Sequence, residues 1–344
     1  MIRVLIVEDS PVVSQMLSYI LSSDPDIKVV GIATNGEEAI RMTVRLKPDV
    51  VTMDIVMPGM DGYEATRKIM ETTPVPIVIV SSSYNYTEVA KSFKALEAGA
   101  LAMIAKPVGI GHPLFEKHSS DLINTIKTLS TIKMGKYKRR IKPDKKVIVK
   151  KEIARQEIRM IAIGASTGGP PVLQTILSGL PKNLPVPVAI VQHITQGFTA
   201  GFTSWLSDVT GFNVCVPENG EICIPGKVYV APDNAHMVFD YGGRILLNND
   251  PPDNLLKPSV AHLFISVANV FREKAVGVLL SGMGRDGAEG LKMMRDMGAV
   301  TIAQDEESSV VFGMNGEAVR LGAARYVLSP EDITQMLIHL ISGK

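Results

Sequence analysis

Short apolar runs alternate with amphipathic stretches along almost the whole chain, and this alternation restricts the fold more than any other feature. Helical patterns such as Ser14 to Leu21 and Glu37 to Leu46 lie between the runs. Apolar runs separated by helical patterns are typical of βαβ units with buried parallel strands. The runs cover residues 2–7, 27–32, 50–53, 76–80, 101–105, 158–163, 186–191, 227–230, 275–280 and 299–303. The alternation predicts the α/β fold class, and Gly242-Gly243 between two short strand-like pieces predicts a small antiparallel hairpin.

A strongly basic stretch divides the chain. Between Lys133 and Arg159 there are twelve basic and three acidic residues, a net charge of +9 in a chain whose total is +1. A charge run with few large apolar residues favours a solvated linker. The alternative is an arm that binds DNA or a membrane, but aromatic residues are nearly absent from it. We expect two doubly wound domains around this linker: residues 1–125, a linker over 126–155, and residues 156–344.

The bulk composition fits a globular protein. The chain has 344 residues, of which 46% are hydrophobic, and this leaves room for two cores. Cys215 and Cys223 lack metal-type spacing, which favours reduced thiols in a cytoplasmic protein. No apolar stretch approaches the roughly 20 residues that span a bilayer, and acids follow the first run directly, unlike in a signal peptide. We expect a cytoplasmic monomer without a transmembrane segment and without nucleic acid as a partner.

Polar residues stand where the strands of the first domain would end. Glu8 and Asp9 follow the first run, Asp54 the third, Ser81 the fourth and Lys106 the fifth. The carboxyl ends of parallel strands share one crevice, so these groups would meet there. Clustered carboxylates favour a bound Mg²⁺, and a carboxylate beside Mg²⁺ can accept a phosphoryl group. Each acid could instead cap a helix, but matched chemistry at four strand ends favours phosphoryl transfer.

Over residues 1–125 these features resemble the receiver domains of response regulators. The resemblance also rests on Pro107 after Lys106 and on Met57-Pro58-Gly59-Met60-Asp61-Gly62 after Asp54. It implies a flavodoxin-like (βα)5 domain in which Asp54 accepts phosphate from a histidine kinase. It further implies a set of ligands for Mg²⁺: Glu8, Asp9, Asp54 and the Val56 carbonyl.

In the same resemblance Ser81 would bind the phosphoryl group and Lys106 would pair with it. Two residues depart from the family pattern. Glu8 stands where aspartate is more frequent, and Met103 stands where many receivers carry a switch aromatic residue.

The first run of the second domain ends in a glycine-rich turn, Gly164-Ala165-Ser166-Thr167-Gly168-Gly169-Pro170. Glycine permits a sharp reversal, and proline suits the first turn of a following helix. The pattern G-x-S-x-G fits a nucleophile elbow, which lifts a serine clear of the backbone near free helix N–H groups. A phosphate cradle and a close helix–sheet contact are the alternatives.

A serine nucleophile needs a histidine base. His193 directly follows a strand that should lie beside the strand ending at Ser166, and we favour it for this reason. His236 and His262 lie nearer loops and remain competitors. His339 lies on an amphipathic C-terminal pattern, and we interpret it as structural.

The candidate acid is Asp286, within a second glycine-rich strand-to-helix turn after residues 275–280. This turn can present a carboxylate at the same edge and offer N–H groups to an oxyanion. Alternatively, Asp286 caps the helix that begins near Ala288. The chain order Ser, His, Asp differs from that of the α/β-hydrolases, in which the acid precedes the histidine.

Taken together, the chain resembles the CheB family of chemotaxis protein-glutamate methylesterases over almost its whole length. Besides the receiver and the linker, the resemblance rests on six motifs: Gly164–Gly169, Gln192-His193, Ala231-Pro232-Asp233, Gly282–Gly287, Ala303–Glu306 and Val311–Met314. It implies a mainly parallel α/β methylesterase domain that hydrolyses glutamate methyl esters of chemoreceptors, releases methanol and deamidates receptor glutamines.

The resemblance also implies roles for single residues. Ser166 would attack the ester, His193 would act as base and then acid, and Asp286 would orient His193, without a cofactor. Thr167 and the Met283 backbone N–H would support the oxyanion.

Regulation is implied as well. The receiver would inhibit the esterase until a chemotaxis histidine kinase phosphorylates Asp54. Two local departures, Ala261-His262 and Asn315, do not adjoin the proposed triad, so we expect them to affect only loop shape and receptor preference.

Two other functions of the second domain remain as alternatives to the esterase. One is a DNA-binding output with the basic linker as contact arm, for which the second half shows no helix-turn-helix pattern. The other is a non-catalytic domain in which the turn Gly164–Gly169 holds phosphate.

Overall fold

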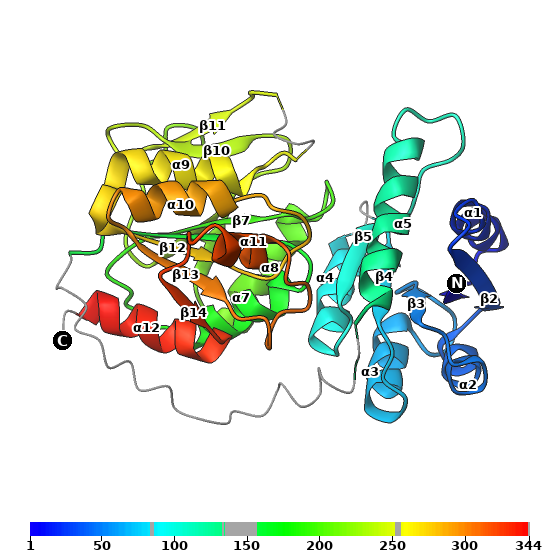
Figure 1. Ribbon diagram of the computed structural model, residues 1–344. Helices are drawn as coiled ribbons and strands as arrows, with labels where there is room; N and C mark the ends of the chain where they lie inside the picture. Colours follow the sequence, from blue (N-terminus) through cyan, green and yellow to red (C-terminus); the bar gives the residue numbers. More distant parts are fainter. Residues whose placement is uncertain (83–85, 133, 135–156, 252–255, 343–344) are drawn as a thin grey trace. The chain divides into compact units, whose positions relative to one another are not determined.

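The computed structural model describes residues 1–82, 86–132, 134, 157–251 and 256–342. They form two compact units, one N-terminal and one C-terminal (Figure 1). Most of the basic stretch, residues 135–156, lies outside the described residues.

The N-terminal unit contains a five-stranded parallel sheet in the order β2-β1-β3-β4-β5. Its strands are β1 (Ile2–Val7), β2 (Ile27–Ala33), β3 (Val50–Met53), β4 (Ile77–Ser81) and β5 (Ala102–Ala105). Its helices are α1 (Pro11–Ser22), α2 (Gly36–Leu46), α3 (Gly62–Thr72), α4 (Tyr86–Glu97) and α5 (Phe115–Ser130). This strand order is that of flavodoxin-like folds, so the fold expected for the first domain is confirmed.

Local sequence explains where these elements begin and end. The strand β3 is buried at every position, as expected for a strand covered on both faces. Ser10 caps α1 ahead of Pro11, and the Asp61 carboxylate caps α3 by accepting the Glu64 N–H. Helix α5 continues to Ser130, so residues 126–130, expected to open the linker, belong to this helix.

The C-terminal unit is built on a seven-stranded sheet in the order β14-β13-β12-β6-β7-β9-β8. All its strand pairs are parallel. The strands are β6 (Met160–Ala165), β7 (Val188–Gln192), β8 (Asn213–Cys215), β9 (Lys227–Val230), β12 (Ala275–Leu279), β13 (Val300–Gln304) and β14 (Tyr326–Leu328). The chain order reverses between β6 and β12, which creates a topological switch point at the carboxyl ends of these strands.

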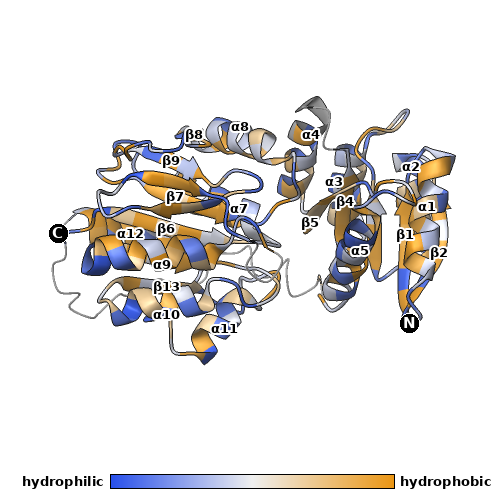
Figure 2. Ribbon diagram, turned by 90° about the horizontal axis from the view of Figure 1, so that it is seen from above, coloured by the Kyte–Doolittle hydropathy of each residue, from blue (hydrophilic) through white to orange (hydrophobic). Residues whose placement is uncertain are grey.

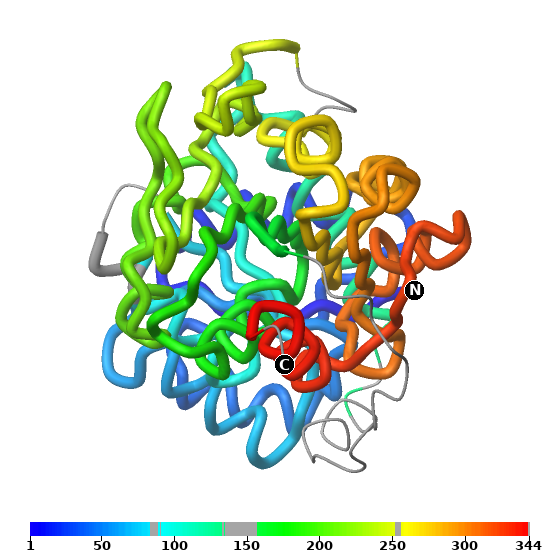
Figure 3. Tube along the Cα trace, turned by 90° about the vertical axis from the view of Figure 1, so that its left-hand side faces the viewer, coloured from blue at the N-terminus to red at the C-terminus, as the bar shows by residue number. Residues whose placement is uncertain are grey.

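Helices cover both faces of this sheet. They are α7 (Gly169–Gly179), α8 (Thr199–Thr210), α9 (Val260–Phe271), the 3-10 helix η1 (Arg272–Lys274), α10 (Ala288–Asp296), α11 (Met314–Arg320) and α12 (Pro330–Ser342). Helices α9 and α10 pack together on one side, and α12 packs with α7 on the other (Figures 1 and 3). The doubly wound arrangement expected for this domain is confirmed.

The hairpin predicted around Gly242-Gly243 is also present. Strands β10 (His236–Phe239) and β11 (Ile245–Asn248) form a separate antiparallel sheet. It packs on α9, with Phe239 edge-on to Phe271 at a centroid distance of 5.4 Å. The hairpin therefore packs against α9 and contributes to the core of the C-terminal unit.

Apolar side chains form the core around each of the two parallel sheets. In Figure 2 the strands are predominantly hydrophobic, whereas the helices carry hydrophilic residues over part of their surface. Residues of the C-terminal core that are fully buried include Met160, Tyr229, Phe264 and Leu291. Within the part of the chain that the structure describes, no helix is both long enough and apolar enough to cross a membrane.

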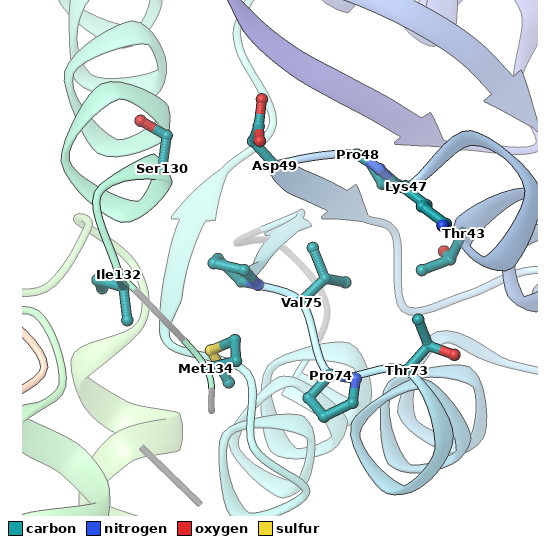
Figure 4. A pocket seen from close by; sticks show the side chains of 11 residues that line it. Thr43, Lys47, Pro48, Asp49, Thr73, Pro74, Val75, Ser130, Ile132 and Met134 are labelled. Atoms are coloured by element: carbon teal, nitrogen blue, oxygen red, sulfur yellow. The ribbon is translucent and has the colours of Figure 1, made fainter. Parts of the chain in front are cut away.

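The N-terminal unit also contains a groove of about 460 Å³ (Figure 4). Its lining comes from the segments that precede β3 and β4 and from the end of α5: Thr43, Lys47, Pro48, Asp49, Thr73, Pro74, Val75, Pro76, Ser130, Ile132 and Met134. These segments lead into the amino ends of β3 and β4. The groove therefore lies at the amino ends of the strands, whereas Asp54 follows the carboxyl end of β3.

Candidate active site

Ser166 stands at the turn between β6 and α7, as the elbow pattern predicts. The two glycines of the pattern serve different purposes. Gly168 caps α7 with φ at +78°, a left-handed conformation that glycine adopts without strain. Gly164 is required by packing, because a Cβ there would lie 2.2 Å from Cγ1 of Val260 on α9.

Backbone hydrogen bonds hold Ser166 on both sides. Its N–H donates to the carbonyl of Ser281 at 3.0 Å, and its carbonyl accepts the Gly169 N–H at 2.8 Å. The Gln192 amide donates to the same carbonyl at 2.9 Å. The nucleophile candidate is therefore tied to the end of β12, to its own helix and to β7.

His193 follows β7, the strand that pairs with β6, as expected. Ala165 pairs with Gln192 at the end of these strands, and the His193 N–H donates to the Ala165 carbonyl at 2.9 Å. His193 Nε2 lies 2.9 Å from Oδ2 of Asp286. An ionised carboxylate can only accept, so Nε2 carries a proton and Nδ1 of the neutral ring is left as the proton acceptor.

Asp286 accepts four hydrogen bonds, which come from two directions. The Ser259 hydroxyl and the Ala261 N–H donate to Oδ1 at 2.9 and 3.0 Å. The Val260 N–H and His193 donate to Oδ2 at 2.7 and 2.9 Å. The carboxylate thus lies on the N-terminus of α9, where free N–H groups and the helix dipole favour an anion.

This geometry excludes one alternative and corrects one expectation. Asp286 does not cap the helix that begins at Ala288, since the cap position of α10 is Gly287, and it binds the start of α9 instead. The departure at Ala261 was expected to stay clear of the triad, but the Ala261 N–H contacts Asp286 directly. Sequence spacing could not show this contact, because it joins residues 25 positions apart.

The donors also set the charge of Asp286. Burial alone would raise the pKa of this carboxyl, but the hydrogen bond and charge of His193 and the N–H groups of Val260 and Ala261 outweigh it. The pKa of Asp286 is therefore held below its usual value. The group remains ionised at neutral pH and can stabilise a proton on His193.

Ser166 and His193 occupy neighbouring strand ends, yet among the described residues no hydrogen bond joins Ser166 Oγ to the imidazole. Catalytic hydrogen bonds are often long without substrate and tighten when it binds. The structure brings base and acid into contact and places the nucleophile candidate at the adjacent strand end.

The competing histidines are not in loops, contrary to expectation. His236 begins β10, is fully buried, and stacks on His262 of α9 at a centroid distance of 3.9 Å. His236 Nδ1 accepts the Ser259 N–H at 3.2 Å and Nε2 contacts the Pro251 carbonyl at 3.3 Å, so both nitrogens are engaged. His339 lies on helix α12, as expected.

The turn after β12 lies against Ser166 and includes the expected oxyanion residue. A Cβ at Gly282 would lie 2.7 Å from Cβ of Ser166, so this turn approaches the nucleophile closely. The neighbouring Met283 is 43% exposed. The Ser281 hydroxyl donates to the Thr167 carbonyl at 2.8 Å, which joins this turn to the elbow.

A second polar network supports that turn from behind. Gln304 Oε1 accepts the Ser281 N–H at 2.8 Å. Asn315, fully buried, donates to the Gln304 carbonyl and to the Ser309 hydroxyl. Asn315 therefore makes no contact with the triad, in agreement with the expectation, but it stabilises the segment on which Ser281 rests.

The acidic cluster of the N-terminal unit forms as the sequence predicts. One carboxylate oxygen from each of Glu8, Asp9 and Asp54 lies within 4.8 Å of the others, which suits a divalent cation with oxygen ligands. Lys106 Nζ lies 2.8 Å from Asp54 and 3.0 Å from Glu8. Ser81 Oγ is buried and has no hydrogen-bond partner among the described residues.

Burial dominates the electrostatics of this cluster. It raises the pKa of Glu8 and of Asp54 above their usual values, and the neighbouring carboxylates Asp54 and Asp9 add to the effect. Ion pairs with Lys106 counteract this only in part, although they raise the pKa of Lys106 itself against the effect of burial. Burial thus disfavours the charged carboxylates more than one lysine compensates, and a divalent cation would counteract this.

Sequence patterns missed Ser259 and Gln192 as contacts of the triad. Ser259 precedes the apolar pattern of α9, a signature of a helix N-cap, and its hydroxyl does accept the Ala261 N–H. That signature could reveal the cap but not its contact with Asp286. The contacts of Gln192 depend on the pairing of β6 with β7.

Comparison with known proteins agrees with this architecture. A family model described as CheB methylesterase matches residues 161–337, and one described as response regulator receiver domain matches residues 4–113. A protein-glutamate methylesterase/protein-glutamine glutaminase of Syntrophus aciditrophicus is 51% identical over 345 residues, which cover 99% of this chain and 98% of the relative. A protein of the same name from Nitrosospira multiformis is 48% identical over 348 residues, covering 100% and 98%.

A solved structure is similar to the C-terminal unit. The crystal structure of the Thermotoga maritima CheB methylesterase catalytic domain is 36% identical, with a TM-score of 0.52, and the match covers 54% of this chain and 99% of that one. These matches do not favour a DNA-binding or non-catalytic output. With half of the chain matched by the methylesterase model and close relatives that span its full length, the chain belongs to the CheB methylesterase family and carries a receiver domain ahead of the methylesterase domain.

Proposed function

We propose that this protein hydrolyses methyl esters of glutamate side chains on chemoreceptors and deamidates receptor glutamines, under control of its receiver domain. The names of its relatives support the reaction class. The observation that carries the assignment of residues is the 2.9 Å contact of His193 Nε2 with Asp286 Oδ2, at the strand end next to Ser166.

In the proposed reaction Ser166 Oγ attacks the ester carbonyl carbon and its proton passes to His193 Nδ1. Asp286 holds the other nitrogen and stabilises the imidazolium. When the tetrahedral intermediate collapses, the bond to the methoxy oxygen breaks and His193 returns the proton, which releases methanol. Water then attacks the acyl-enzyme by the same proton transfers and yields a free glutamate side chain. An amide substrate would release ammonia at the first collapse.

The oxyanion needs donors close to Ser166. The close approach of the turn after β12 to Ser166 supports Met283 in this role, and the hydrogen bond of Ser281 to the Thr167 carbonyl joins the turn to the elbow. We assign the Met283 backbone N–H to the oxyanion and Thr167 to the support of the elbow.

In the receiver, Asp54 would accept a phosphoryl group from a histidine kinase. Glu8, Asp9, Asp54 and the Val56 carbonyl would hold Mg²⁺, which neutralises charge during phosphoryl transfer. Lys106 would pair with the phosphoryl group and Ser81 would donate its hydroxyl to it. The unphosphorylated receiver would hold the esterase inactive, and phosphorylation would favour an active arrangement through its differential interaction free energy.

Methanol release from methylated receptor tests this scheme in the wild type, in Ser166→Ala and in Asp54→Asn. We expect Ser166→Ala to abolish release and Asp54→Asn to retain only the basal rate without activation by a phosphoryl donor. Full activity in Ser166→Ala would overturn the nucleophile assignment.

A further inference from the structure

A single amide group joins the two proposed catalytic residues. Gln192, the last residue of β7, is 4% exposed. Its Nε2 donates one hydrogen bond to the carbonyl of Ser166 and another to the carbonyl of His193, both at 2.9 Å. The side chain therefore uses both of its N–H donors on the backbone of the nucleophile and of the base.

The orientation of this amide is determined by its partners. A reversed amide would place Oε1 against two carbonyl oxygens, so Nε2 must face them. Oε1 then has no hydrogen-bond partner among the described residues, and it lies against Gly169, where a Cβ would approach it to 2.3 Å. A buried carbonyl oxygen without a partner is unfavourable, and an apolar side chain of similar size would avoid it. The unpartnered oxygen therefore offsets part of the stability that the two hydrogen bonds contribute.

The two hydrogen bonds complete the restraint of both backbones. The Ser166 carbonyl accepts from Gly169 and from Gln192, and its N–H donates to Ser281. The peptide groups on both sides of Ser166 are thus fixed, and with them the direction of its Cα–Cβ bond. The His193 N–H is bonded to Ala165 and its carbonyl to Gln192, which fixes the base in the same way.

We propose that Gln192 is a positioning residue for the esterase reaction, which sets Ser166 and His193 relative to each other by holding both carbonyls with one amide. It contacts neither the substrate nor the reacting atoms. The inference rests on the proposed roles of Ser166 and His193.

The test uses the full-length protein with Mg²⁺ and acetyl phosphate as phosphoryl donor, which activates the receiver, and a fluorophosphonate probe, so that no receptor is needed. The Ser166 oxygen bonds to phosphorus, fluoride leaves and the proton passes to the base. Mass spectrometry identifies the labelled residue, and the rate constant is measured well below the melting temperature. Because small misplacements of reacting groups slow a reaction strongly, we expect the near-isosteric Gln192→Met to label about 10- to 100-fold more slowly than the wild type.

A second variant gives a signature that a merely structural role would not produce. In Gln192→Glu the carboxyl would be buried against two carbonyl oxygens, which raises its pKa. Protonated, it donates to one carbonyl; ionised, it repels both. All other titratable groups are the same in both proteins, so the ratio of the variant rate to the wild-type rate isolates the new carboxyl. We expect this ratio to rise as the pH is lowered from about 9 to about 6.

Thr301→Val is the matched control, because it removes a buried hydroxyl that donates to the Ala323 carbonyl at 2.7 Å, away from Ser166 and His193. It should lower the melting temperature and leave the labelling rate within about twofold. Labelling of Gln192→Met at the wild-type rate, or a pH-independent ratio for Gln192→Glu, would overturn the inference. Absence of labelling at Ser166 in the wild type would overturn the assignment of Ser166 as the nucleophile. The Glu variant keeps the test decisive if the Met variant does not fold.

Discussion

Replacing Ser259 with alanine tests how the N-terminus of α9 holds Asp286. The variant loses a hydroxyl that donates to Asp286 Oδ1 at 2.9 Å and accepts the Ala261 N–H at 3.2 Å. A hydrogen bond to a charged group contributes about 1.5–3 kcal/mol, and an N-cap hydroxyl about 1 kcal/mol. The N–H groups of Val260 and Ala261 remain on the carboxylate, so the terms do not simply add. We expect the free energy of unfolding to fall by about 2–3 kcal/mol at neutral pH.

The dependence of this loss on pH follows from the charge of Asp286. Its pKa in the folded protein lies below the ordinary value, so its contribution to stability is present at neutral pH and is lost as the pH falls through the folded pKa. Removing the Ser259 hydroxyl moves the pKa back toward the ordinary value. The difference in the free energy of unfolding between wild type and variant should therefore be largest at pH 7 and should decrease below about pH 4.

Urea unfolding followed by Trp205 fluorescence provides the assay, because the single tryptophan of the chain is buried in the C-terminal unit. Ser266→Ala serves as the control: its hydroxyl lies on the same helix and donates to the Leu263 carbonyl, with no contact to Asp286. That variant should change the free energy of unfolding by about 0.5 kcal/mol or less at every pH. A loss in Ser259→Ala as small as in the control, or one that grows as the pH falls, would refute the reasoning.

Three further predictions concern the two sites. Asp286→Asn should lower the rate of methanol release by about 10³- to 10⁴-fold while the protein stays folded, because the amide no longer fixes the His193 tautomer; a loss below tenfold would contradict this role. Mg²⁺ at ten times its Kd should stabilise the receiver unfolding transition by about 1.4 kcal/mol, and Asp9→Ala should abolish this shift in calorimetry; equal shifts in both proteins would place the cation elsewhere. Deletion of residues 1–150 should leave an esterase that is active without any phosphoryl donor; a folded but inactive fragment would rule out simple inhibition by the receiver.

The sequence predicted the features that depend on local pattern. Apolar runs located the central strands to within a few residues, since strands buried on both faces are continuously apolar. The strands β8 and β14 were not predicted, because they are three residues long and stand at the two edges of the sheet. Such short segments give no pattern of their own, and their pairing with β9 and β13 makes them strands.

The residues of the candidate sites likewise divide into those that a local pattern predicted and those whose contacts depend on packing. Ser166, His193 and Asp54 follow strand ends, and the rule that parallel strands open into one crevice was sufficient to group them with their partners. The contacts of Asp286 were beyond that rule. They connect the turn after β12 with the start of α9, and only the packing of α9 against β6 and β12 brings these segments together. His236 was misplaced for the same reason, since its burial depends on the hairpin packing on α9.

The position of Asp286 explains how a buried carboxylate can serve the proposed base. An acid without compensation would take up a proton on burial, and then it could no longer stabilise an imidazolium. A lysine or arginine beside it would keep it ionised but would compete with His193 for its charge. The N–H groups of Val260 and Ala261 and the Ser259 hydroxyl keep it ionised without a cation. The negative charge therefore remains available to His193 at the moment when the imidazole becomes positive, and no group has to reorient for this.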